Sequence, residues 1–131
     1  MTGNLTNPRE DVNTSNDNIV IVDNLQTIRG GRTLDVTGYK KSVINAGHVI
    51  IKETASGVYK PMPLTSEGTA YAALPVGHEY AGILVGTIRT NRPFAAILVR
   101  GTVNHAAAPF SMATILQAVK TALPLIDFRQ D

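Results

Sequence analysis

The sequence contains no cysteine and no tryptophan, and aromatic residues make up only 5% of its 131 positions. Without cysteine, the chain forms no disulfide, no thiolate metal site and no cysteine nucleophile. So few aromatic rings provide neither a stacking platform for single-stranded nucleic acid nor an aromatic cofactor site. The fold must therefore be held by packing alone, and a domain of this length can bury about two-thirds of its unfolded surface.

Long apolar runs are absent as well, and none approaches the ~20 residues that a membrane-spanning helix needs. The first residues, MTGNLTNPRED, lack the basic and apolar regions of a secretion signal. The 12 basic and 10 acidic residues leave a net charge of +2, which is too small to require a nucleic-acid partner. We therefore expect a soluble protein made in a cytoplasm, with neither a membrane nor a nucleic acid as its partner.

Residue types that could carry chemistry are scattered along the chain: His48, His78, His105, Ser56, Ser111, Glu53, Glu67 and Glu79. The histidines have no second ligand at metal spacing, neither serine lies in a nucleophile elbow, and no glutamate has a partner carboxylate. Glycine-rich phosphate-binding loops are also missing. We therefore predict a protein that is not an enzyme, with no catalytic residue, metal or cofactor. The alternative is an enzyme or small-ligand binder on a small barrel, which would require His48, His78 or Glu79 to converge in a cleft.

The segment from Tyr80 to Asn104 has the strongest strand pattern. Its two apolar runs, Ile83–Val85 and Ala95–Val99, are continuous rather than alternating, which predicts strands covered on both faces. Thr90–Pro93 separates the runs, and proline suits a turn or a first strand position because it donates no ladder hydrogen bond. The pattern predicts an antiparallel hairpin around which the fold is organised. Three glycines at the ends of these runs permit bulges or close backbone approach: Gly82, Gly86 and Gly101.

Other segments add strands to this hairpin. Ala46–Lys52 and Val58–Pro61 flank a turn at Thr54–Gly57 and predict a second hairpin nearer an edge of the sheet. Thr33–Tyr39 alternates as a strand does, and Ile19–Val22 is a β-branched run that either closes the sheet or pairs with another chain. The glycines between these two segments favour a turn over an RGG-type nucleic-acid segment, because the motif is not repeated.

One helix is predicted, after residue 110. Ser111 can cap it, Pro124 stops it, and its length of ~20 Å is enough to cover one face of a small sheet. Its apolar face follows a 3.6-residue period and comprises Ile115, Leu116, Val119, Ala122 and Leu123. Leu125–Arg129 then adds a final strand or places Phe128 beside the helix. The predicted fold class is therefore mainly β (α+β): a small β-barrel or β-sandwich-like domain of hairpins with one C-terminal helix.

Residues 1–18 are polar and rich in asparagine, and they cannot bury enough apolar surface to fold alone. We therefore divide the chain into an extended polar N-terminal arm, residues 1–18, and a single β-rich domain, residues 19–131. The composition of the arm is typical of a disordered leader. An arm that binds a partner surface would instead become ordered there.

Several of these motifs resemble the head decoration proteins of tailed phages. They are the Ala46–Ile50 run, the Gly57–Pro61 return, the Tyr80–Leu84 strand and, above all, Ile97–Asn104 followed by alanines and a closing helix. The resemblance covers about Gly30 to Phe128. Ala118–Ile126 is further similar to the head-fibre or auxiliary capsid proteins of phages that infect gut bacteria. These motifs are structural turns and strands, and none is a catalytic signature.

The resemblance implies a structural virion protein that binds the outer surface of a phage capsid and stabilises it, often as a trimer at local threefold positions. Its partner would be the major capsid protein, with further copies of itself or a fibre protein, and it would be synthesised in the cytoplasm of the bacterial host. On this interpretation, the N-terminal segment contacts the capsid or a neighbouring subunit through Asn16, Asn18, Ile19, Val20, Ile21 and Val22. Deleting residues 1–18 is then expected to reduce capsid occupancy. The related alternative is a head-fibre base or adaptor that anchors a projecting fibre.

Overall fold

The computed structural model describes residues 12–130, and within that range the chain is mainly β, as predicted. The strands are β1 (Ile21–Thr27), β2 (Arg32–Thr33), β3 (Val43–Ile44), β4 (Val49–Glu53), β5 (Tyr59–Pro61), β6 (His78–Leu84), β7 (Ile88–Arg89), β8 (Phe94–Ala95), β9 (Ile97–Asn104) and β10 (Ile126–Arg129). The helices are α1 (Asp17–Val20), the 3-10 helix η1 (His105–Ala107) and α2 (Leu116–Ala122). Residues 1–11 of the predicted arm lie outside the described range. Among residues 12–130, no helix is long and apolar enough to cross a membrane.

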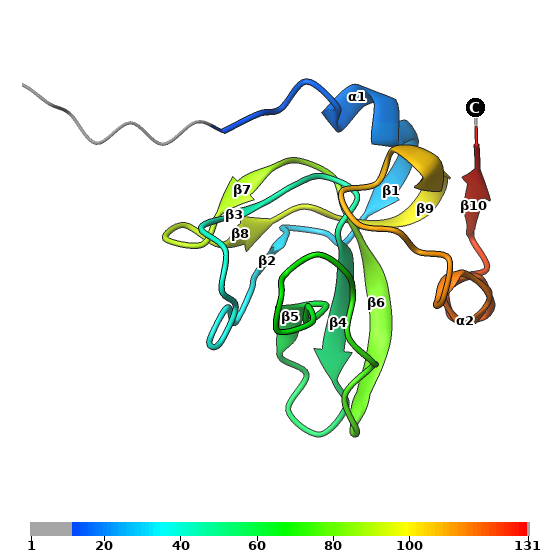
Figure 1. Cartoon of the computed structure of the whole chain (residues 1–131). Helices are drawn as coiled ribbons and strands as arrows, with labels where there is room; N and C mark the ends of the chain where they lie inside the picture. Colours follow the sequence, from blue (N-terminus) through cyan, green and yellow to red (C-terminus); the bar gives the residue numbers. More distant parts are fainter. Residues whose placement is uncertain (1–11, 131) are drawn as a thin grey trace, which may run out of the picture.

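Six of the strands form one sheet in which β9 has the most partners (Figure 1). The strand order is β1-β9-β6-β4-β5, and these neighbours are antiparallel. β10 confirms the predicted final strand and pairs with β9 in parallel. Two small two-stranded sheets, β2-β8 and β3-β7, are drawn to the left of the larger sheet in Figure 1, and α2 is drawn on its right. β9 therefore joins early, middle and late segments of the chain.

The central strands of the six-stranded sheet are buried on both faces, as their continuous apolar runs predict. Along β4, Val49 and Ile51 enter a core on one face while Ile50 enters a core on the other, because successive side chains of a strand point in opposite directions. The helix-side core consists of Val20, Val49, Ile51, Met62, Tyr71, Ile83, Leu98, Val103, Met112, Val119, Leu123, Ile126 and Phe128. The second core includes residues of the two small two-stranded sheets and is called the ribbon-side core. It consists of Leu34, Ile44, Ile50, Leu84, Ala95 and Ile97. The domain is thus a layered β structure with two cores that share one sheet.

The predicted central hairpin is confirmed as a strand pair, but its connection is longer than a turn. β6 and β9 pair antiparallel through two register positions at the end of β6. Between β6 and β9 the chain forms β7, which pairs with β3, and β8, which pairs with β2. A bridge between Arg89 and Arg92 closes the tight turn between β7 and β8. The run Ala95–Val99 therefore divides between two sheets, because Ala95 packs into the ribbon-side core beside β2.

The second hairpin is confirmed, and β5 lies at an edge of the sheet as predicted. Its turn is closed by the N–H of Gly57, which donates to the carbonyl oxygen of Glu53 at 2.8 Å, with Gly57 at φ +76°. Pro61 ends the strand. The outer side of β5 is partly covered, because the N–H of Asp35 donates to the carbonyl oxygen of Tyr59 at 2.9 Å. This bond holds residues 35–40 against the hairpin.

The strand predicted over Thr33–Tyr39 is wrong beyond its first residue. The carboxylate of Asp35 accepts hydrogen bonds from the backbone N–H of Thr37 (3.0 Å) and from its hydroxyl (2.6 Å). An aspartate that binds the backbone two residues ahead favours a turn over a strand. Leu34 in this segment is nevertheless buried in a core of the domain.

The C-terminal helix is shorter than predicted, since α2 has only 7 residues. Ser111 does not cap it, because the hydroxyl of Ser111 accepts from the N–H of Ala113 at 3.3 Å within a preceding turn. This turn places Met112, which is 1% exposed, in the helix-side core. Ala122 is exposed rather than part of the buried face, and the helix ends before Pro124 as predicted.

Candidate functional site

The six residues predicted to contact a capsid lie at the corner between α1 and β1. The strand predicted over Ile19–Val22 is wrong for its first half, because Ile19 and Val20 belong to α1 and the strand begins at Ile21. Val20 is 1% exposed and lies in the helix-side core. Packing of this helical turn outweighs the strand preference of its β-branched residues.

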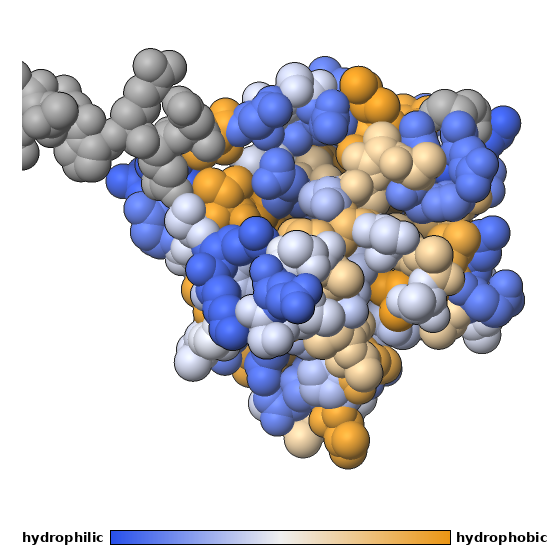
Figure 2. Space-filling view, viewed as in Figure 1, coloured by the Kyte–Doolittle hydropathy of each residue, from blue (hydrophilic) through white to orange (hydrophobic). Residues whose placement is uncertain are grey.

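The same corner displays apolar side chains to solvent. Ile21 pairs with Val103 of β9, so β1 forms an edge of the chain's own sheet. Ile19 is 52% exposed and Val22 is 43% exposed, and Leu25 further along β1 is 68% exposed. We define the α1–β1 surface as the exposed residues Asn16, Asn18, Ile19, Val22 and Leu25. Figure 2 shows hydrophobic side chains at the upper part of the molecule, where Figure 1 draws α1.

The α1–β1 corner is held in place by hydrogen bonds to distant loops. The carboxylate of Asp17 accepts from the backbone N–H of Thr87 at 3.0 Å and from its hydroxyl at 2.7 Å. The hydroxyl oxygen of Thr87 also accepts from the N–H of Ala46 at 3.1 Å. The side-chain amide of Asn45 donates to the carbonyl oxygen of Asn13 at 3.3 Å. This anchor could not be predicted from the sequence, because no local pattern connects Asp17 with a threonine 70 positions away.

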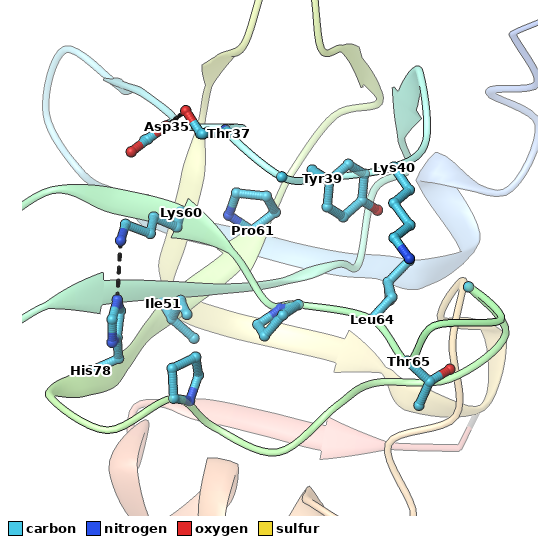
Figure 3. Close-up of a pocket in the computed structure, with 14 residues that line it drawn as sticks. Asp35, Thr37, Tyr39, Lys40, Ile51, Lys60, Pro61, Leu64, Thr65 and His78 are labelled. Atoms are coloured by element: carbon cyan, nitrogen blue, oxygen red, sulfur yellow. Dashed lines mark hydrogen bonds between the residues drawn. The ribbon is translucent and has the colours of Figure 1, made fainter.

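A second feature is a cavity of about 280 Å³ beside the β4–β5 hairpin, which the sequence analysis did not predict (Figure 3). Its lining comes from three separated stretches of chain: Asp35, Thr37, Gly38, Tyr39 and Lys40; Ile51, Lys60, Pro61, Pro63, Leu64, Thr65 and Gly68; and Pro75 and His78. Apolar groups dominate the walls, and polar groups gather at two ends. Figure 3 shows Lys60 and His78 near one end, Lys40 and Thr65 near the other, and Tyr39 between them. The arrangement is typical of a small ligand-binding pocket.

The polar groups at the Lys60 end satisfy one another. The ammonium of Lys60 lies 3.4 Å from the carboxylate of Glu53 and 3.3 Å from Nε2 of His78. Because an ammonium only donates, Nε2 of His78 accepts, and its Nδ1 carries the proton that is donated to the carbonyl oxygen of Val76 at 3.0 Å. Hydrogen bonds from Ser56 and from Lys60 lower the pKa of Glu53. This end of the cavity is therefore an internally paired polar network.

The cavity does not bring together the groups whose convergence would have indicated an enzyme. His78 lines it, but His48 lies in the interior and Glu79 pairs with Lys52 at 3.3 Å outside it. The hydroxyl of Thr37 donates to the carboxylate of Asp35, and this bond helps to lower the pKa of Asp35. Within residues 12–130, no group of three or more His, Asp or Glu side chains could hold a metal ion. Of the three side chains named for the alternative, only His78 therefore lines this cavity.

His48 lies in a buried aromatic cluster next to the cavity wall. Its ring makes edge contacts with those of Tyr39, Tyr71 and Phe110, at centroid separations of 5.7, 5.1 and 5.7 Å. Its Nε2 lies 3.0 Å from the carbonyl oxygen of Met62, so Nε2 carries the donated proton. Burial lowers the pKa of His48 to about 4. His48 is thus a neutral core residue with a structural role.

Comparisons with protein-family models, with curated proteins and with solved structures return no match for this chain. The α1–β1 surface contains most of the predicted contact residues, and the cavity contains one of the three groups named for the alternative, His78.

Proposed function

We propose that the protein is a non-enzymatic structural component that binds the outer surface of a tailed-phage capsid and stabilises it. Two lines of reasoning support the proposal. The motifs between Gly30 and Phe128 resemble those of head decoration proteins. In addition, the domain carries an apolar surface at the segment where contact with the capsid is expected.

The observation that carries the proposal is the exposure of apolar side chains on the α1–β1 surface. Ile19 and Leu25 are more than half exposed, although other residues of α1 contact the rest of the domain. Val20 is buried in the helix-side core, and Asp17 is hydrogen-bonded twice to Thr87. A preformed apolar surface loses little conformational entropy on binding, and such surfaces commonly mark protein contacts.

The chemistry of this surface suits a contact of modest strength. Its apolar residues are flanked by Asn16 and Asn18, whose amides can donate and accept at the rim of an interface. A shell presents many identical sites, so a weak contact at each one still gives high occupancy where several copies or contacts act together. We propose the major capsid protein as the partner, with a second copy of this chain or a fibre protein as a further neighbour.

Cosedimentation with expanded capsids that lack the protein tests this proposal. We expect saturable binding at a fixed ratio to the major capsid protein, and a ratio near one copy per few subunits would indicate dense decoration. A much sparser ratio would favour the alternative of a head-fibre base. Absence of saturable binding would overturn both capsid functions.

Substitutions then test whether the α1–β1 surface makes the contact. Ile19→Asp and Leu25→Asp place a charge on this surface and are expected to weaken binding by about tenfold or more, because a buried unpaired charge is costly. Val76→Asp is the matched control, since Val76 is 100% exposed in a turn outside this surface. Circular dichroism checks that each variant is folded. Equal binding by all three variants would show that the contact lies elsewhere.

A further inference from the structure

The cavity beside the β4–β5 hairpin has walls that are rigid before any ligand arrives. Pro61, Pro63 and Pro75 contribute three of its lining side chains, and the ring of Tyr39 and the side chain of Leu64 add apolar surface. Proline rings have a fixed φ and almost no side-chain entropy to lose. A ligand that packs against them therefore gains contact without ordering the protein, which favours binding.

The two polar ends of the cavity differ in whether their lysine already has a partner. At one end Lys60 is already paired with Glu53 and with His78. At the other end lies Lys40, which makes no hydrogen bond or ion pair with any residue in the range 12–130. Figure 3 shows the side chain of Lys40 extending along the cavity from the Tyr39 side toward Leu64. Of the charged groups in the lining, Asp35 is hydrogen-bonded to Thr37 and Lys60 is paired with Glu53, so the cation without a partner lies at the Lys40 end.

We propose that this cavity binds a small carboxylate with a flat or short apolar body, with the carboxylate at Lys40 and the apolar part between the prolines and Tyr39. The volume of about 280 Å³ lies just below the range of about 300–1,000 Å³ for ligand pockets, so it suits a single ring rather than a large cofactor. The ammonium of Lys40 attracts a carboxylate but not a neutral analogue, so the charged ligand should bind more tightly. This site is separate from the α1–β1 surface and does not depend on capsid binding.

Titration of the purified protein with 3-phenylpropanoate, followed by amide NMR, tests the site directly. We expect shifts centred on residues 37–40, 60–65 and 75–78 and a Kd of about 1 mM, as for a fragment of this size. The neutral amide, 3-phenylpropanamide, is expected to bind about threefold more weakly, because it lacks the charge that Lys40 matches.

Lys40→Met provides the decisive variant and Lys41→Met its matched control, because the two lysines are adjacent and exposed but only Lys40 lines the cavity. Lys40→Met is expected to lower the affinity for 3-phenylpropanoate by about threefold and to leave the affinity for 3-phenylpropanamide unchanged. Lys41→Met is expected to leave both affinities unchanged. Shifts at other residues, or no saturable shifts at all, would overturn the site. Equal effects of the two lysine variants would overturn the role of Lys40.

Discussion

At the scale of single residues, the buried imidazole of His48 makes stability depend on pH. The folded protein holds it neutral with a pKa of about 4, compared with 6.5 for an ordinary histidine. Below pH 6.5 the unfolded chain therefore binds a proton that the folded protein does not, so stability falls as the pH falls from 6.5 and levels off below about 4. We expect a loss of about 2 kcal/mol between pH 7 and pH 5.

Urea unfolding at pH 7, 6 and 5 measures this loss. His48→Gln keeps a donor for the carbonyl oxygen of Met62 but does not titrate, so its stability should change much less over the same interval. The carboxylates of Asp35 and Glu53 have lowered pKa values, so their effect on stability appears at a pH below the interval from 7 to 5. A wild-type protein as stable at pH 5 as at pH 7 would contradict the prediction.

Two tyrosines of the aromatic cluster should respond in opposite ways when their hydroxyls are removed. The buried hydroxyl of Tyr39 has no hydrogen-bond partner within residues 12–130, and burial raises its pKa to about 12. The hydroxyl of Tyr71 accepts from the N–H of Val49 at 3.1 Å. Tyr39→Phe is therefore expected to leave stability unchanged or to raise it by up to about 1 kcal/mol, whereas Tyr71→Phe leaves Val49 unpaired and costs about 1–2 kcal/mol. Thermal unfolding of both variants checks the contrast, and two losses of equal size would refute it.

At the scale of elements, α1 is held in position by the burial of Val20 and by the hydrogen bonds of Asp17. Its 4 residues are too few to form a stable helix alone, and Asp17 supplies both described hydrogen bonds to Thr87. Asp17→Ala is expected to cost about 1–2 kcal/mol and to raise amide hydrogen exchange in residues 17–22 above that of the other elements. Asp23→Ala on exposed β1 is the control for loss of a nearby carboxylate. If residues 17–22 exchange at the same rate in both variants, the contact between Asp17 and Thr87 does not hold α1 in place.

Elements with an extended apolar pattern could be predicted from sequence, and elements fixed by distant contacts could not. The strands β4, β6 and β9 were predicted because they carry continuous apolar runs, which are typical of strands buried on both faces of a sheet. Gly82 and Gly101 were also placed correctly at close approaches, since an added Cβ on either would meet the neighbouring strand. By contrast, α1 forms because Val20 packs in the core and Asp17 meets Thr87, and neither contact has a local signature.

At the scale of the whole molecule, the two candidate sites differ in how visible they were in the sequence. The α1–β1 surface lies within one short segment, so most of its residues could be named before its structure was known. The cavity is assembled from residues 35–40, 51–68 and 75–78, and of its prolines only Pro61 was named from the sequence, at the end of a predicted strand. Sites made from separated loops depend on tertiary structure, and the spacing of their residues carries no motif.

The pairing of β1 with β9 sets the order of events during synthesis. Ile21 pairs with Val103, and Thr27 pairs with Leu98, so β1 leaves the ribosome long before any residue that completes it. Until then its apolar side chains and open edge are available to other nascent chains. Non-local pairing of this kind also slows folding, typically to milliseconds or seconds. During translation, the N-terminal segment is therefore exposed to contacts with other chains until β9 has been made.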